Sequence, residues 1–298
     1  MADGVSSRPH LDSTVLDFQI ESYSLAAATS FGPRLVSLRH QEGPEFFAQL
    51  GREILIEHPD SGTYRFHGGH RLWLSPEVPA ITYASDDHPC VVASNTEDIT
   101  ITGPIDAAGF VKELSVSLDG ERLVIDHRVA NAGPQPISVA LWGITQFRLG
   151  GMALIPFRGP SPGPSPGADF QADRSLVLWP YTNLVDPRLT WRERAAVIEA
   201  VPGPRLKIGS GPNPERLGYL IDRQLFTKEI VPAGNETYPD RGAVAQVFLD
   251  DSFCELESVG PIVSLEPRAS ASHREIWQVT ECADLATAYI RLVDEVGV

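Results

Sequence analysis

The chain has 298 residues, of which 42% are hydrophobic and 21% are charged, and its formal net charge is −15. This length and composition indicate a globular protein with a sizeable core, built as one large domain or two smaller ones. The acidic balance argues against nucleic acid or an anionic membrane surface as a partner. No apolar run approaches the about 20 residues that a membrane helix needs.

The N-terminal segment and the cysteines both favour a cytoplasmic location. The N-terminal segment has no basic stretch followed by an apolar one, so no secretory signal is expected. The cysteines Cys90, Cys254 and Cys282 are odd in number and far apart. They are typical of reduced thiols in a cytoplasmic protein, not of a disulfide framework or a zinc site.

The first unusual segment is YRFHGGHRLW, residues 64–73. Its two glycines allow a tight turn between His67 and His70, and histidines suit proton transfer near neutral pH. The pair could ligate a metal with His88 as a third ligand, or it could lie in a turn and bond backbone or water. Because no HExxH or paired CxxC motif supports a metal, we predict neither metal nor cofactor.

Residues 111–147 predict an antiparallel meander. Apolar residues alternate with polar ones and are separated by an Asp119-Gly120 turn and an Asn-Ala-Gly-Pro break. The alternating sets are Leu114, Val116 and Leu118, then Leu123, Ile125 and Val129, then Ile137, Val139 and Leu141. His127 falls on an apolar face, where a hydrogen-bonded core histidine is more common than a ligand.

The rest of the chain continues in the same style. Residues 158–169 are rich in proline, glycine and serine and predict a surface loop inside one domain that spans residues 1–298. Residues 192–199 are the best helix candidate. Three segments near 243–251, 252–260 and 270–280 predict further short strands. The chain is therefore expected to be all-β, an antiparallel sandwich or barrel.

The strand near 253–259 carries two carboxylates on one face. With a period of two, Glu255 and Glu257 share a face with Phe253 and Val259. In a partly apolar site such carboxylates would have a raised pKa and suit a general base. Alternatively they are an ordinary solvated strand face. No nucleotide-binding loop, GxSxG elbow or EF-hand loop is present, which leaves those functions without support.

Several of these segments together resemble the galactose mutarotase-like, or aldose 1-epimerase, superfamily. They are HGG with a nearby tryptophan at 67–73, the strands LVIDHRVANAGPQPISVALWGITQF, YPDRG at 238–242 and FCELESVGPIVSLEPRASASHREIW. The resemblance implies a large antiparallel β-supersandwich that binds a monosaccharide or the sugar end of a glycan. It implies anomer interconversion in which a glutamate removes the anomeric proton and a histidine protonates the ring oxygen.

Carried onto this sequence, the resemblance implies specific roles. Glu257 would be the base, with Glu255 as the alternative, and His67 would bind substrate near the ring oxygen. Because the family's own acid histidine has no counterpart here, His67 or His70 would supply the proton instead. Binding residues would be Arg71, Trp73, Trp142, Lys228 and Asp240, and Arg71 and Lys228 would be the partners of a phosphorylated substrate.

One departure from the family pattern opens an alternative. The family's acid histidine lies in an NHxYF segment, and Trp142 and Gly143 stand in its place here. The second hypothesis is therefore a non-catalytic carbohydrate-binding protein, or different sugar chemistry at the same site. A third, a structural or partner-binding sandwich, predicts that Glu255 and Glu257 are fully solvated and that His67 is buried or faces away.

Overall fold

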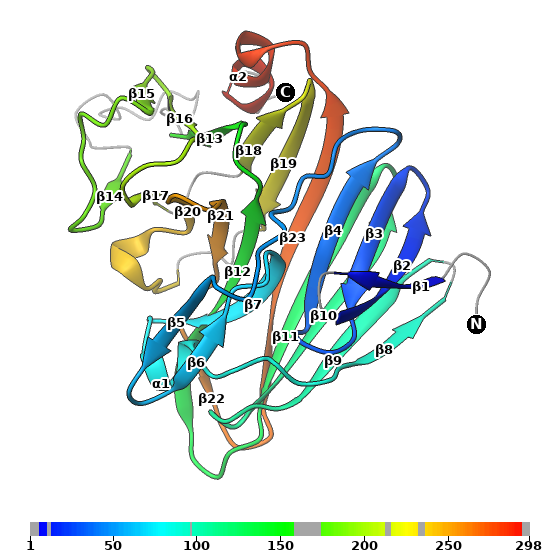
Figure 1. The fold of residues 1–298 in the computed structure, drawn as a ribbon. Helices are drawn as coiled ribbons and strands as arrows, with labels where there is room; N and C mark the ends of the chain where they lie inside the picture. Colours follow the sequence, from blue (N-terminus) through cyan, green and yellow to red (C-terminus); the bar gives the residue numbers. More distant parts are fainter. Residues whose placement is uncertain are drawn as a thin grey trace, which may run out of the picture.

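The computed structural model describes residues 6–10, 13–95, 97–157, 174–211, 216–231 and 236–293. Two large antiparallel sheets dominate these residues, and they lie face to face in Figure 1. The predicted all-β sandwich is confirmed. The predicted surface loop at 158–169 lies outside the described residues.

The first sheet has 11 strands. In spatial order they are β1 (Ser6–His10), β2 (Ser13–Ile20), β3 (Tyr23–Ala28), β4 (Arg34–His40), β7 (Gly69–Ser75), β12 (Ile137–Phe147), β21 (Cys254–Val259), β20 (Ala245–Leu249), β17 (Leu206–Ser210) and β14 (Leu176–Leu178), with β22 (Val263–Leu265) paired to β12. Its centre therefore combines strands from three distant parts of the sequence.

The second sheet has 10 strands. In spatial order they are β15 (Leu189–Trp191), β16 (Ala195–Glu199), β13 (Met152–Pro156), β18 (Arg216–Ile221), β19 (Gln224–Ile230), β23 (Ser270–Glu281), β11 (Arg122–Asn131), β10 (Phe110–Asp119), β9 (Ile99–Ile105) and β8 (Val91–Ser94). Outside the two sheets lie the hairpin β5 (Leu55–His58) and β6 (Gly62–Arg65), the helices α1 (Pro79–Thr82) and α2 (Leu285–Val293), and the 3-10 turn η2 (Asp240–Gly242). Among the described residues, no helix is long and apolar enough to cross a membrane.

The meander prediction is right for two strands and wrong for the third. β10 and β11 pair around the predicted turn, in which Gly120 has a φ of 62°, a conformation that favours glycine. β12 instead leaves for the first sheet, where it pairs with β7 and β21. The crossing is fixed by Asn131, whose side-chain amide donates to the carbonyls of Gln135 and Leu265.

The helix predicted at 192–199 is also wrong. Arg192 closes a tight turn on Ala195, and Ala195–Glu199 then forms strand β16, paired with β13. Alanine, arginine and glutamate favour a helix locally. Pairing with β13 and burial of Val197 and Ile198 outweigh that preference, since strand formation depends mainly on the surroundings.

The main hydrophobic core lies between the two sheets. Leu35, Ile208 and Leu256 of the first sheet and Leu114, Ile125 and Trp277 of the second belong to one buried cluster. Because side chains alternate along each strand, the residues between these core positions on the first sheet point the other way. We call that side, which faces away from the second sheet, the outer face.

Candidate functional site

The register of β7, β12 and β21 places the predicted glutamates and tryptophans on the outer face. Trp142 pairs with Trp73, and Ile144 lies between Arg71 on one side and Glu257 on the other. Cross-strand partners share a face, so these side chains lie together. Continuing the same rows, Gln146 pairs with Glu255 on β21, Gln246 of β20 pairs with Glu257, and Lys207 of β17 lies opposite Phe248. The outer-face site consists of Arg71, Trp73, Trp142, Gln146, Lys207, Gln246, Glu255 and Glu257.

Glu257 is fully buried, and one of its oxygens is firmly held. Oε2 accepts hydrogen bonds from Trp142 Nε1 and Lys207 Nζ, each at 2.8 Å. The Lys207 ammonium lies 4.7 Å from the ring centroids of both Trp142 and Trp179. Two such donors, one of them cationic, fix the position of this oxygen and leave it no role as a donor. Its other oxygen, Oε1, has no protein partner among the described residues.

Glu255 lies two residues before Glu257 and has a different environment. It is 6% exposed, and its Oε1 accepts from Arg71 Nη2 at 3.2 Å. Burial raises the pKa of Glu255 to about 7; the Arg71 charge works against this shift, and the charge of Glu257 adds to it. The guanidinium of Arg71 in turn lies 4.2 Å from the Trp73 ring centroid. A carboxyl group with this pKa exchanges its proton near neutral pH.

The outer-face site is rich in buried polar atoms that the protein does not satisfy. Among the described residues, six such atoms have no hydrogen-bond partner: Nε and Nη1 of Arg71, both amide atoms of Gln146, Oε1 of Gln246 and Oε1 of Glu257. Buried polar groups are normally paired, and an unpaired one costs about 1–3 kcal/mol. Their concentration on neighbouring strands of one face indicates a place for a polar ligand.

Aromatic side chains border this site. Tyr181 is 42% exposed and contacts Phe248, and Tyr83 contacts Trp73. Burial of their hydroxyls raises the pKa of Tyr181 and of Tyr83 above the usual range, and the charge of Glu257 adds to the effect at Tyr181. Both phenols are therefore neutral at physiological pH. Glu257 itself has no exposed surface, so a ligand reaches it only when the side chains around it move.

Asp240 reaches the outer-face site through one intermediate. It lies in η2, and its Oδ2 accepts from the amide of Gln246 at 3.2 Å. Gln246 is the cross-strand partner of Glu257. The structure thus brings Asp240, Arg71, Trp73, Trp142 and both glutamates into one neighbourhood.

His67 lies at the edge of this neighbourhood. It has a left-handed φ of 55°, stacks on Phe31 with 3.9 Å between ring centroids, and bonds Asp87 at 2.6 Å. The bond to His67 and the nearby Arg65 hold the pKa of Asp87 down at about 2. These contacts are with the loop around Asp87 rather than with Glu255 or Glu257.

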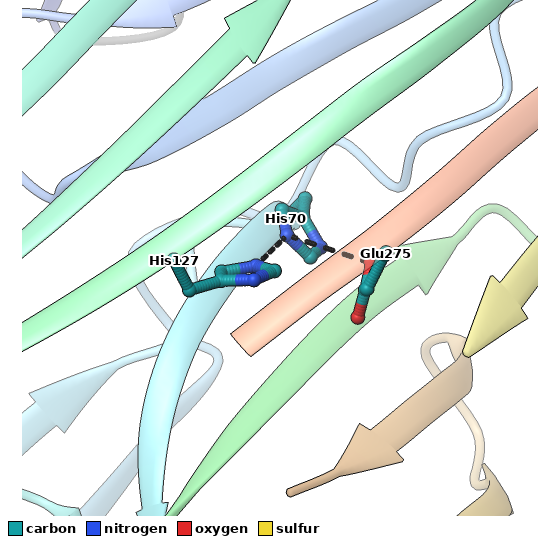
Figure 2. Close-up of side chains that lie close together, drawn as sticks. All are labelled: His70, His127 and Glu275. Atoms are coloured by element: carbon teal, nitrogen blue, oxygen red, sulfur yellow. Dashed lines mark hydrogen bonds and ion pairs between the residues drawn. The ribbon is translucent and has the colours of Figure 1, made fainter. Parts of the chain in front are cut away.

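His70 and Lys228 lie on the other side of the first sheet, in the core. His70 bonds Thr145 Oγ1 at 2.8 Å and His127 Nε2 at 2.7 Å, and Lys228 bonds Glu275 Oε1 at 3.0 Å. Figure 2 shows His70 between His127 and Glu275. Both His70 and Lys228 have no exposed surface. The sheet itself separates them from the two glutamates, so their predicted roles as acid and phosphate partner would require a different packing of the strands.

The hydrogen bonds of the buried histidines fix their tautomers. His127 Nδ1 donates to the carbonyl of His273 at 3.0 Å, so its Nε2 accepts from His70 Nε2, and His70 Nδ1 then accepts from the Thr145 hydroxyl. Burial lowers the pKa of both His70 and His127, so both are neutral. Each ring nitrogen of His70 and His127 thus has a hydrogen-bond partner in the protein, although His70, His127 and Glu275 are close enough to hold a cation.

A second cluster, His67 with Asp86 and Asp87, is likewise already neutralised. Asp86 pairs with Arg34 at 2.8 Å, and Asp87 pairs with Arg65. A metal ion would have to compete with two guanidinium groups. The exposed His88 belongs to neither cluster, and His67 and His70 do not converge, so the HxxH spacing does not build a ligand set.

Sequence reasoning missed three residues of the site, namely Lys207, Gln146 and Gln246. Each is a long polar side chain within a strand of mostly apolar or small residues: RLKIGS, WGITQF and VAQVFL. The available signal was their position along the strand, because residues two apart point to the same face of a sheet. Gln146 is in phase with Trp142, and such a residue is either at a solvated edge or in a buried polar site.

Comparison with known proteins supports the architecture and little beyond it. No family model matches the sequence, and no curated protein does. Solved structures match at low identity. A galactose mutarotase-like protein from Lactobacillus casei ATCC 334 is 12% identical with a TM-score of 0.52, over 89% of this chain and 100% of that one.

Two further structures agree with it. A galactose mutarotase-like protein from Clostridium acetobutylicum is 9% identical with a TM-score of 0.50, over 93% of this chain and 98% of that one. A protein of Synechocystis sp. PCC 6803 is 15% identical with a TM-score of 0.52, over 93% and 96%. At these identities the likeness concerns the fold. The chain has the galactose mutarotase-like fold, as the resemblance in its sequence implied.

Proposed function

We propose that the outer-face site binds a sugar and interconverts its anomers, with Glu257 as the base. The observation that carries the proposal is the asymmetry of this carboxylate. Oε2 is held by Trp142 and Lys207, whereas the buried Oε1 has no partner among the described residues. A carboxylate that is held through one oxygen and leaves the other unpartnered is suited to accept a proton from a ligand hydroxyl.

The surrounding groups suit a carbohydrate. A sugar presents hydroxyls that both donate and accept, and the free amide atoms of Gln146 and Gln246 offer both functions. The indole rings of Trp73 and Trp142 meet at 5.5 Å between centroids and offer apolar faces on which a sugar ring can stack.

In the proposed reaction Glu257 takes the proton of the anomeric hydroxyl. The electron pair forms the carbonyl at the anomeric carbon, the bond from that carbon to the ring oxygen breaks, and the ring oxygen takes a proton. Rotation and reclosure yield the other anomer. The step requires a proton donor on the far side of the ring oxygen from the base.

A second candidate function is sugar binding without turnover. It is favoured by Trp142, which occupies the place of the family's acid histidine and donates to Glu257 instead. It is also favoured by the position of His70 in the core, where it cannot donate to a ligand on the outer face.

The test is two-dimensional exchange NMR of anomer interconversion for a panel of hexoses, pentoses and sugar phosphates. Wild-type protein should accelerate exchange of one of them, and Glu257→Gln should lower the rate by about 10² to 10⁴. Glu42→Gln, at an exposed turn residue, is the matched control and should retain the rate. Line broadening of one sugar without acceleration would favour binding alone. A panel that shows neither effect refutes both functions.

A further inference from the structure

We propose that Glu255 is the proton donor of this site and takes the role that a histidine has elsewhere in the superfamily. The inference rests on the proposed function and names its missing partner. It follows from the geometry of β21, from the charges around Glu255, and from the lack of another suitable acid among the described residues of the outer-face site.

The first argument is spacing. Glu255 and Glu257 are two residues apart on one strand and project from the same face. Their Cα atoms are therefore about 7 Å apart along the strand. The anomeric hydroxyl and the ring oxygen of a pyranose are bonded to one carbon, and each would lie about 2.7 Å from its carboxyl partner. The two oxygens of one sugar thus fit between the two carboxyl groups.

The second argument is that the two carboxyl groups have opposite environments. Glu257 is paired with the Lys207 ammonium at 2.8 Å, which favours its anion. Glu255 is 6% exposed, and among the described residues its ion pair is the longer contact of 3.2 Å to Arg71, so that burial prevails and raises the pKa of this carboxyl to about 7. Near neutral pH a large fraction of Glu255 therefore carries a proton. Pairs of carboxyls separated in this way divide into an acid and a base.

The third argument is elimination within the described part of the site. Burial raises the pKa of Tyr83 and of Tyr181 above the usual range, which makes both phenols poor proton donors. A guanidinium group does not serve as a proton donor in proteins, which excludes Arg71. The Lys207 ammonium donates to the base Glu257 and lies over the rings of Trp142 and Trp179, and the amides of the glutamines do not transfer protons.

With this assignment the two glutamates account for every proton that moves in the reaction. Glu257 gains the anomeric proton as the carbonyl forms, and Glu255 loses its proton to the ring oxygen as the carbon–oxygen bond breaks. Reclosure reverses both transfers: Glu257 returns its proton to the anomeric oxygen, and Glu255 regains a proton from the hydroxyl that attacks the carbonyl. No metal, cofactor or water is consumed.

Arg71 sets how readily Glu255 gives up its proton. Its charge lowers the pKa of Glu255, and it is itself held by the Trp73 ring at 4.2 Å. Arg71 therefore acts as a positioning residue for the acid. Replacing it with a neutral side chain should raise the pKa of Glu255 and extend the protonated state to higher pH.

The experiment is the pH profile of kcat/KM for anomer exchange, after subtraction of the spontaneous rate. Wild-type activity should fall as pH rises through about 7, where Glu255 loses its proton. Glu255→Gln should lower kcat/KM by about 10² to 10⁴ and abolish this alkaline limb. Glu255→Asp should retain the limb with a lower rate, and Arg71→Gln should move the limb to higher pH. Urea unfolding of each variant verifies that it folds.

The outcomes separate the two proposals. If the wild type is active and Glu255→Gln keeps both rate and limb, the donor role of Glu255 is overturned while the epimerase proposal stands. If Arg71→Gln leaves the limb in place or moves it to lower pH, the limb belongs to another group, and the assignment is likewise overturned. If the wild type accelerates no sugar, the epimerase proposal fails and the donor role fails with it.

Discussion

Replacing Glu255 by glutamine should change how the stability of the protein depends on pH. The folded-state pKa of Glu255 is about 7, above the ordinary value of 4.5. The folded protein therefore binds more protons than the unfolded chain between these values, and stability is lost as pH rises through that window. Between pH 5 and pH 8 the two pKa values correspond to a loss of about 2.5 kcal/mol in the free energy of unfolding. Glutamine cannot ionise, so Glu255→Gln should lack this loss.

The assay is urea unfolding of wild type and Glu255→Gln at intervals from pH 5 to pH 8. The difference between the two proteins should shift by about 2.5 kcal/mol in favour of the variant as pH rises. Glu42→Gln, at an exposed position, controls for the removal of a carboxylate and should run parallel to wild type. Parallel curves for Glu255→Gln as well would show that Glu255 ionises normally, and the reasoning from burial would be refuted.

Substitutions at three further positions test the packing of the site and of the buried network behind it. Lys207→Met leaves the carboxylate of Glu257 buried without its cation and should lower the free energy of unfolding by about 3–5 kcal/mol in urea, whereas Lys207→Arg should cost much less. Gly143→Ala would place a Cβ 2.2 Å from Glu275 Oε1, so urea unfolding should show a loss of about 1–3 kcal/mol; unchanged stability would contradict that close approach. Burial lowers the pKa of His273 from 6.5 to about 3, so stability should fall as pH drops below 6.5, by about 3 kcal/mol between pH 7 and pH 4. His273→Gln should show a smaller loss over the same range, and an equal loss would assign the acid sensitivity to other groups.

The fold was predictable because period-two alternation and turn residues are local signals. They identified β10, β11 and the turn at Gly120, and they placed Glu255 and Glu257 on one face of β21 together with Val259. The sheet to which β12 belongs was not predictable. Its partners come from residues 69–75 and 254–259, and no local pattern encodes pairing over such separations.

The surroundings of the glutamates were not predictable either. Every residue of β21 is buried, so both faces of this strand are covered, and alternation alone cannot tell which face looks toward the second sheet. The hypothesis of fully solvated glutamates is wrong, since Glu257 has no exposed surface. Its burial depends on Trp142 and Lys207, which lie far away in the sequence.

The position of His70 could have been predicted, because alternate residues of a strand face opposite sides of the sheet. In GHRLWLS the side chains of His70 and Leu72 share one face, and those of Arg71 and Trp73 share the other. Leu72 belongs to a core cluster, and Trp73 belongs to the cluster around Trp142. Once Trp73 is assigned to the outer face, His70 must lie in the core.

Strand β21 therefore connects two polar assemblies on opposite sides of one sheet. Lys228 Nζ donates at 3.0 Å to the carbonyl of Leu256, the residue between the two glutamates, and Ser258 donates at 2.5 Å to Glu275. The buried network thus fixes the backbone that carries the carboxyl groups. A polar network in the core is costly to build and is rigid once all its members are bonded. Its position directly behind the glutamates is consistent with support of their geometry, since active groups need a rigid second layer of contacts.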